Sequence, residues 1–165
     1  MKRIWASWRM KFISKTNKDP GCVFCNALAK KDNDDNLIAM RGKHAFIILN
    51  KYPYTNGHLM VAPLVHKANL EDLDAPTRAE MMELSTQCMT ILRKIYNPQG
   101  FNLGANIGEA AGAGVPGHVH MHIVPRWNGD TNFMTTVGDV RVLPEELIDT
   151  YRRVKECLII TILQG

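Results

Sequence analysis

The stretch His118-Val119-His120-Met121-His122-Ile123-Val124 places histidine at three alternate positions, half of the six histidines in the chain. Successive side chains of an extended strand point to opposite faces, so the three imidazoles share one face while Val119 and Met121 point to the other. The second face is hydrophobic and can pack in a core. Burying three imidazoles side by side costs desolvation and brings repulsion if they become protonated. We therefore interpret the imidazole face as a functional site.

Two kinds of chemistry suit a row of imidazoles. One is a zinc centre with three histidine ligands and a reactive water. The outer α-carbons of this row would lie about 13 Å apart, whereas zinc holds nitrogens at about 2.0–2.1 Å, so a single metal would strain the strand. The other is nucleophilic catalysis, because a neutral imidazole is nucleophilic near pH 7. His120 is the predicted nucleophile, since it has an imidazole neighbour on each side.

A glycine-rich loop precedes the histidines. The segment Asn106-Ile107-Gly108-Glu109-Ala110-Ala111-Gly112-Ala113-Gly114-Val115-Pro116-Gly117 contains four glycines, and glycines allow backbone N–H groups to converge on an anion. Its last six residues match G-x-G-x-x-G, but a dinucleotide fingerprint must follow a strand and open a helix, whereas this loop leads into a predicted strand. The glycines either form a turn only or hold a phosphate. Their position beside a nucleophile favours the phosphate.

The composition is that of a single globular domain spanning residues 1–165. Of the 165 residues, 45% are hydrophobic and 22% are charged, ordinary values for a protein with a hydrophobic core. Neither a run of about 20 apolar residues nor a secretory signal is present, so we expect a cytoplasmic protein with no membrane partner. A net charge of +4 suits a small polyanionic ligand and is too weak to indicate nucleic acid.

Five segments are predicted to be strands. They are rich in alternating or β-branched residues, and turn residues separate the first three, so those three are expected to be antiparallel. The predicted strands are residues 37–40, 45–50, 58–63, 101–106 and 118–124.

Two helices complete a predicted α+β fold. The first lies between Asp74, which can cap it, and Asn97-Pro98, which ends it. Its apolar stripe consists of Met81, Leu84, Cys88, Leu92 and Ile95. A second helix is expected to begin near Pro144, in a C-terminal extension of residues 131–165. Residues 1–20 form a basic, aromatic arm before a core of residues 21–130.

The histidine motif, followed by Pro125-Arg126, resembles the signature of the histidine-triad (HIT) superfamily. The resemblance extends from about Cys22 to Asp130 and includes Gly57-His58 and the glycine-rich loop. It implies a five-stranded, mostly antiparallel sheet with one long helix and a C-terminal helix. It also implies a homodimer whose sheets join, and a nucleotide in each subunit's cleft.

The resemblance further assigns roles within that cleft. His120 would attack the α-phosphorus of the substrate and become nucleotidylated, while His122 would contact the phosphate and Asn50 the ribose. The remaining contacts with phosphate oxygens would come from Asn106 and from Gly112, Ala113, Gly114 and Val115.

Two further segments are similar to the microbial branch near the dinucleoside-tetraphosphate phosphorylases and hydrolases. They are Trp5-Ala6-Ser7-Trp8-Arg9 and the residues from Pro125 to Phe133. In the fragile-histidine-triad branch a glutamine often occupies the position of Ala113, so this chain lacks that side-chain contact with phosphate. Trp127 either stacks on a ligand or packs against the protein, and we include it among the candidate substrate-binding residues.

Cys22 and Cys25 have the C-x-x-C spacing of a zinc half-site. Some histidine-triad proteins bind zinc through such a pair, and the resemblance implies His66 and His118 as the other two ligands. A Cys₂His₂ set is closed to substrate, so the zinc would be structural. No organic cofactor is expected, and no functional role is assigned to His58.

These features predict an enzyme that cleaves a dinucleoside polyphosphate, such as diadenosine tetraphosphate, by transfer to water or to inorganic phosphate. The alternatives are a purine nucleoside phosphoramidase, a nucleotide-binding module with little turnover, and a hydrolase that binds zinc on the triad itself. The intact His120 argues against the binding module. The separate ligands Cys22 and Cys25 argue against zinc on the triad.

Overall fold

The computed structural model of the chain describes residues 21–130 and 145–163. The predicted N-terminal arm, the first part of the C-terminal extension and Pro144 lie outside the described residues.

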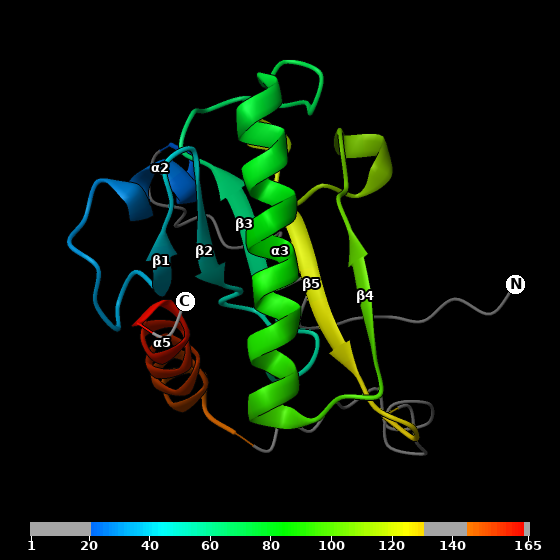
Figure 1. The fold of residues 1–165 in the computed structure, drawn as a ribbon. Helices are drawn as coiled ribbons and strands as arrows, with labels where there is room; N and C mark the ends of the chain where they lie inside the picture. Colours follow the sequence, from blue (N-terminus) through cyan, green and yellow to red (C-terminus); the bar gives the residue numbers. More distant parts are fainter. Residues whose placement is uncertain (1–20, 131–144, 164–165) are drawn as a thin grey trace, which may run out of the picture.

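All five predicted strands are present, and they form one antiparallel sheet (Figure 1). The strands are β1 (Ile38–Arg41), β2 (Ala45–Leu49), β3 (Leu59–Pro63), β4 (Gly100–Gly104) and β5 (Met121–Arg126). Their order across the sheet is β1-β2-β3-β5-β4. Every residue of β2 and β3 is buried, because these apolar strands lie inside the sheet. The predicted α+β fold is therefore confirmed.

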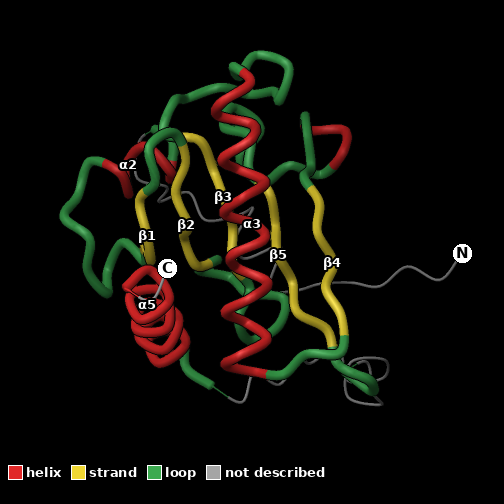
Figure 2. Tube along the Cα trace, in the orientation of Figure 1, coloured by secondary structure: helices red, strands yellow, loops and turns green. Residues whose placement is uncertain are grey.

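The long predicted helix is α3 (Ala75–Tyr96), which crosses one face of the sheet (Figures 1 and 2). Asp74 caps its N-terminus by accepting a hydrogen bond from the backbone N–H of Thr77 at 2.9 Å, and Asn97 ends it in the left-handed conformation, with φ of 46°. The predicted stripe is buried at Met81, Leu84, Cys88 and Leu92. Both ends of this helix and its packing face thus follow from local sequence.

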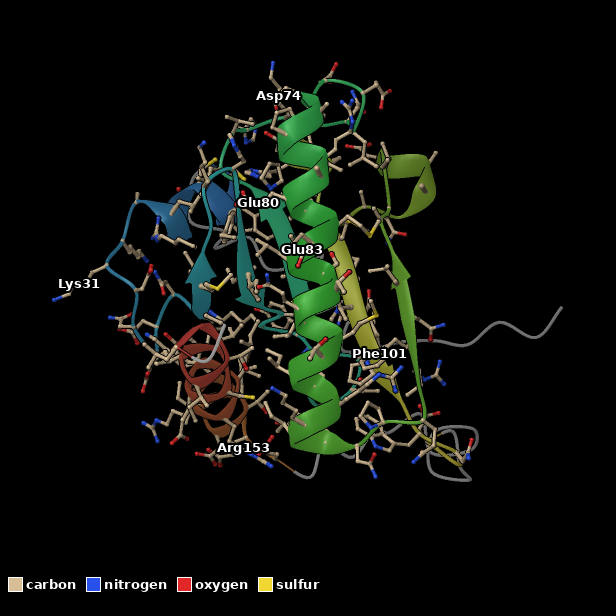
Figure 3. The ribbon with its side chains drawn as sticks, viewed as in Figure 1. Lys31, Asp74, Glu80, Glu83, Phe101 and Arg153 are labelled. Carbon is tan, nitrogen blue, oxygen red and sulfur yellow. The ribbon has the colours of Figure 1, made fainter. Side chains whose placement is uncertain are left out.

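A carboxylate on α3 also holds the turn between β1 and β2. Glu80, labelled in Figure 3 near the first half of the helix, accepts hydrogen bonds from the backbone N–H groups of Lys43, His44 and Ala45. Three backbone donors that the turn leaves unpaired are satisfied in this way. The first hairpin is thereby fixed to the helix that covers the sheet.

The C-terminal helix is α5 (Leu147–Leu163). It lies beside β1 and contacts α3, with Tyr151, Val154 and Leu158 buried. The hydroxyl of Tyr151 donates a hydrogen bond to the carbonyl of Ile38 in β1 at 3.1 Å. Among the helices of the described ranges, none combines the length and the hydrophobicity that a membrane span requires.

Two local features differ from the sequence-based expectation. A short helix, α2 (Val23–Leu28), follows Cys22 and was not predicted. The last strand begins at Met121, three residues later than expected, because the backbone N–H groups of His118 and Val119 bond to Val115 and Lys67 instead of a neighbouring strand. The alternation nevertheless continues through this irregular segment: Val119 is buried in the core, and the imidazoles lie on the opposite side.

Candidate active site and metal centre

A cavity of about 280 Å³ lies between α2, the end of β2 and the glycine-rich loop. Its volume is near the lower end of the range for small-molecule sites, about 300–1,000 Å³. It brings together most of the predicted substrate-binding residues, which come from segments far apart in the chain. The predicted residues that line it are Asn50, Asn106, Gly112, Gly114, Val115, His120 and His122.

Two predicted substrate-binding residues lie outside the lining of this cavity. Ala113 is in the loop, where its backbone N–H donates to the carbonyl of Gly108. The indole N–H of Trp127 donates to the carbonyl of Tyr96 at 3.2 Å, and the two rings meet edge to face. In this arrangement Trp127 packs against the end of α3.

His120 is buried, with 4% of its surface exposed. Its Nδ1 lies 2.8 Å from the carbonyl oxygen of His118. A carbonyl only accepts, so Nδ1 carries the proton and the lone pair remains on Nε2. Burial lowers the pKa of His120 from its ordinary value, which keeps the ring neutral near pH 7. The geometry and the electrostatics both leave a lone pair on Nε2, which can therefore act as a nucleophile.

A second chain of hydrogen bonds determines the tautomer of His122. The backbone N–H of Tyr54 donates to Nδ1 of His58 at 3.1 Å, so in the neutral ring the proton of His58 is on Nε2. That Nε2 lies 3.0 Å from Nδ1 of His122, which must accept, and the N–H of His122 is then on Nε2. Burial, with the charge of His120, lowers the pKa of His122 to about 4. His122 is therefore a neutral hydrogen-bond donor that lines the cavity.

Three residues of this site carried no functional prediction. His58 is buried, with 1% exposed, and acts on His122 as just described. Tyr54 packs its ring on His58, with centroids 4.7 Å apart. Phe24, from α2, places its ring 5.1 Å from His118 and 4.8 Å from His120. The short sequence pattern around each residue gives no sign of these contacts.

The glycine-rich loop turns through positions that favour glycine. Gly108 and Gly112 have φ of +79° and +83°, on either side of a short 3-10 helix, Glu109–Ala111. A side chain at either φ would strain the backbone. Gly114 and Val115 follow this turn and line the cavity together with His120, so this part of the loop could hold an anionic group there.

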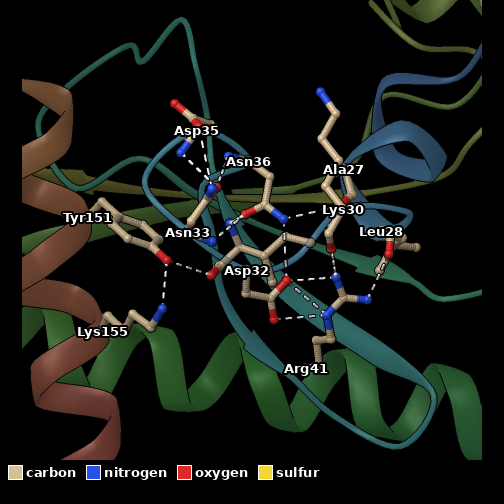
Figure 4. Close-up of polar contacts among 11 residues, drawn as sticks. Ala27, Leu28, Lys30, Asp32, Asn33, Asp35, Asn36, Arg41, Tyr151 and Lys155 are labelled. Carbon is tan, nitrogen blue, oxygen red and sulfur yellow. Dashed lines mark hydrogen bonds and ion pairs between the residues drawn. The ribbon is translucent and has the colours of Figure 1, made fainter.

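The opposite end of the cavity is formed by the loop between α2 and β1, which Arg41 stabilises (Figure 4). Its guanidinium binds both carboxylate oxygens of Asp32 and also donates to the carbonyls of Leu28 and Lys30 at 3.2 Å each. Asn36 adds a hydrogen bond to the carbonyl of Ala27. This network holds the loop against α2, where its residues line the cavity.

The four predicted zinc ligands come together next to the cavity. One ligand atom from each of Cys22, Cys25, His66 and His118 lies within 4.8 Å of the others. The sulfur of Cys22 is 3.4 Å from Nδ1 of His118, and that of Cys25 is 3.4 Å from Nδ1 of His66. A tetrahedral zinc at ordinary bond lengths separates sulfur from nitrogen by about 3.6 Å.

The surroundings of these ligands also suit a metal. Nε2 of His118 lies 2.9 Å from the carbonyl of Pro63, so it carries the proton and directs the Nδ1 lone pair toward the two sulfurs. Burial and the neighbouring Cys22 raise the pKa of Cys25, because two adjacent thiolates repel each other. A bound cation would neutralise both of them. The residues present therefore fit a Cys₂His₂ zinc site.

The chain is similar in sequence and fold to known proteins. The HIT domain model matches residues 30–129. AP-4-A phosphorylase of Mycobacterium tuberculosis is 36% identical over 159 residues, covering 92% of this chain and 82% of that protein. The crystal structure of a Zn-bound histidine triad family protein from Mycobacterium smegmatis has a TM-score of 0.70 and 26% identity, covering 88% of this chain and 98% of that one.

A more distant structure shares the fold. It is Plasmodium falciparum diadenosine triphosphate hydrolase, with a TM-score of 0.65, 19% identity, and coverage of 96% of this chain and 98% of that one. The sequence motif, the sheet order and these similarities lead to one conclusion: the chain belongs to the HIT domain family.

Proposed function

We propose that the chain is a nucleotidyltransferase that cleaves a dinucleoside tetraphosphate and passes the nucleotidyl group to inorganic phosphate. The observation that carries this proposal is the buried His120, whose proton is held on Nδ1, which leaves the lone pair on Nε2, and whose side chain lines a cavity shared with the glycine-rich loop. The 36% identity with AP-4-A phosphorylase supports the dinucleotide substrate and phosphate as acceptor.

The reaction has two displacements. Nε2 of His120 attacks the α-phosphorus, and the bond from that phosphorus to the bridging oxygen breaks, which releases a nucleoside triphosphate. An oxygen of inorganic phosphate then attacks the nucleotidyl-histidine, the N–P bond breaks, and a nucleoside diphosphate leaves with neutral His120 restored. The Nε2–H of His122 donates to an oxygen of the phosphate in transfer, and backbone amides of the loop stabilise developing charge.

Within this scheme Asn50 binds the ribose, while Asn106 and the backbone from Gly112 to Val115 hold phosphate oxygens. Zinc on the two cysteines, His66 and His118 would have a structural role, because four protein ligands leave no position open to substrate. It would fix α2 to the turn that carries His120.

The test is product analysis with diadenosine tetraphosphate, with and without inorganic phosphate. ATP and ADP formed only with phosphate is the expected result. ATP and AMP in plain buffer would instead identify a hydrolase with the same intermediate. Turnover of nucleoside phosphoramidates alone would identify a phosphoramidase, and no turnover of either substrate would identify a nucleotide-binding module.

The His120→Ala variant tests the nucleophile. It should lose turnover while it retains nucleotide binding, and mass spectrometry of the quenched wild-type protein should detect a nucleotidylated histidine. His44→Ala is the matched control, because His44 does not line the cavity. Losing a nucleophile costs several orders of magnitude in kcat, so residual activity above roughly a few per cent in His120→Ala would exclude His120 as the nucleophile.

A further inference from the structure

A second, more open groove of about 350 Å³ adjoins the nucleotide cavity. Strands β4 and β5 form its floor, and the turn that carries Tyr54 forms one side. Three residues, Tyr54, Asn106 and His122, line both spaces. The groove and the cavity therefore meet at His122.

The positions of His120 and His122 indicate which of the two spaces would hold the leaving group. His120 lines the first cavity and is absent from the lining of the groove, whereas His122 lines both. An in-line displacement at phosphorus requires the leaving oxygen to depart on the side opposite the attacking Nε2. A nucleotide held in the first cavity would thus send its leaving group past His122.

We propose that the groove is the subsite for the leaving nucleotide, that is, for the phosphate chain and distal nucleoside of a dinucleoside polyphosphate. This inference rests on the proposed function and adds a binding site and its residues to it. The Nε2–H of His122 then lies where the two halves of the substrate separate, and donates to the phosphates at that point.

Arg126 marks the far end of the groove, four residues beyond His122 on β5, or about 13 Å along the strand. Among the described residues that line the groove, it is the one with a charged side chain. Its Nε and Nη2 donate to the carboxylate of Asp130, and its Nη1 donates to the side-chain oxygen of Asn102 at 2.8 Å.

These contacts hold the guanidinium plane in place and leave part of the side chain, 39%, exposed. Since a guanidinium carries five N–H donors, these three contacts leave two of them for a ligand. A planar cation already fixed by two partners loses little entropy when it binds phosphate or stacks on a base. Asn102 is exposed on β4 beside Arg126. The two side chains together would bind the distal half of the substrate.

The experiment compares two substrates that differ only in what leaves. Diadenosine tetraphosphate has a nucleotide as leaving group, whereas adenosine 5′-phosphoramidate releases only ammonia. Arg126→Gln and Asn102→Ala should each raise KM for the tetraphosphate, by about tenfold for the arginine. Neither should change kcat/KM for the phosphoramidate by more than about twofold.

Arg93→Gln is the matched control, since its guanidinium packs over Phe101 at 5.0 Å and lines neither space. Asn102→Ala leaves the pair between Arg126 and Asp130 intact, which separates loss of the subsite from loss of local structure. The proposal would be overturned if Arg126→Gln and Asn102→Ala lowered kcat/KM equally for both substrates. It would also be overturned if neither variant lowered kcat/KM for either substrate.

A binding measurement decides the question even if the tetraphosphate is not turned over. In the His120→Asn background, calorimetry should show that Arg126→Gln weakens binding of diadenosine tetraphosphate and leaves the Kd of AMP unchanged. An absence of turnover by the wild-type protein would contradict the proposed function alone. Unchanged tetraphosphate binding in the double variant would contradict the subsite.

Discussion

Hydrogen bonds to the buried imidazoles determine which nitrogen of each ring carries a proton. His118 donates from Nε2 and His120 from Nδ1, in both cases to backbone carbonyls. His122 receives a hydrogen bond at Nδ1 from His58, which itself accepts from the backbone N–H of Tyr54. Each ring of the triad thus exposes the atom that its proposed role requires, a metal ligand, a nucleophile or a donor.

Replacing His58 tests this chain of tautomers. His58→Ala removes the donor to Nδ1 of His122, so the proton of His122 can move to that nitrogen and its Nε2 then no longer donates. We expect kcat to fall by about tenfold or more, up to the roughly 10²- to 10³-fold cost of removing a positioned donor altogether, with a small change in KM.

His58→Gln should recover part of the loss, because its amide can donate in the same place. His44→Ala again serves as the control. A His58→Ala variant with unchanged kcat and a lower melting temperature would show that His58 only packs.

The pH dependence of the reaction should follow the pKa of the buried imidazoles. Burial lowers the pKa of His120, and that of His122 is about 4. His120 therefore keeps its lone pair as the pH falls through 6.5, the ordinary histidine value. We expect the acidic limb of kcat/KM to have its midpoint below 6.5. Zinc content should be measured at each pH, and a midpoint at or above 6.5 with zinc retained would contradict the expectation.

At the scale of elements, α2 connects the Cys₂His₂ cluster to the cavity. It has six residues and no side-chain cap, and a helix this short is not stable in isolation. Its position depends on the burial of Phe24 and Ala27 and on the contacts of Cys22 and Cys25 with the two histidines. The same helix presents Phe24 to His120.

Removing the metal ligands should therefore affect both stability and turnover. Metal analysis of protein purified without chelator should find about one zinc per chain. Cys22→Ser should abolish this zinc, lower the melting temperature by at least about 5 °C, and reduce activity through displacement of α2.

Cys157→Ser is the control, since that half-buried cysteine of α5 is outside the cluster. Well under one zinc per chain in the wild-type protein, or full thermal stability of Cys22→Ser, would contradict a structural zinc.

At the scale of the whole molecule, the two edges of the sheet differ. Tyr151 and its neighbours on α5 cover β1, whereas the outer edge at β4 has half-buried and exposed residues only. Leu103 on β4 has 39% of its surface exposed. Within the described ranges no strand pairs with the outer side of β4, and such an edge presents backbone groups that can pair with another strand.

We expect this edge to pair with a second copy, which would join two sheets as the family resemblance implies. Light scattering after size exclusion should give twice the chain mass of 18.6 kDa. Leu103→Pro disrupts the regular backbone of this edge strand and should shift the protein toward the monomer. Val65→Pro is the control, because Val65 is exposed and follows β3, which does not neighbour β4, and it should leave the mass unchanged. A wild-type mass of 18.6 kDa would contradict the dimer.

Much of this architecture could be predicted because its signals are local. The period-two alternation from His118 to His122 indicated which side chains share a face, although the strand itself begins at Met121. Helix α3 begins after Asp74 and ends at Asn97 as expected, since capping depends on residues within one turn. The C-x-x-C pair had the spacing of a half-site, and the family resemblance supplied the other two ligands.

The remaining features depend on contacts between segments far apart in the chain. His58 and His122 are separated by 64 positions. Helix α2 depends on its packing against the core and on the contacts of its cysteines with His66 and His118. The amino-acid sequence by itself determined the strands, the long helix and the row of imidazoles, because hydrophobic periodicity and capping act over a few residues. The tertiary structure decided which nitrogen of each imidazole carries the proton and where the groove beside His122 lies, because both depend on partners that only folding brings together.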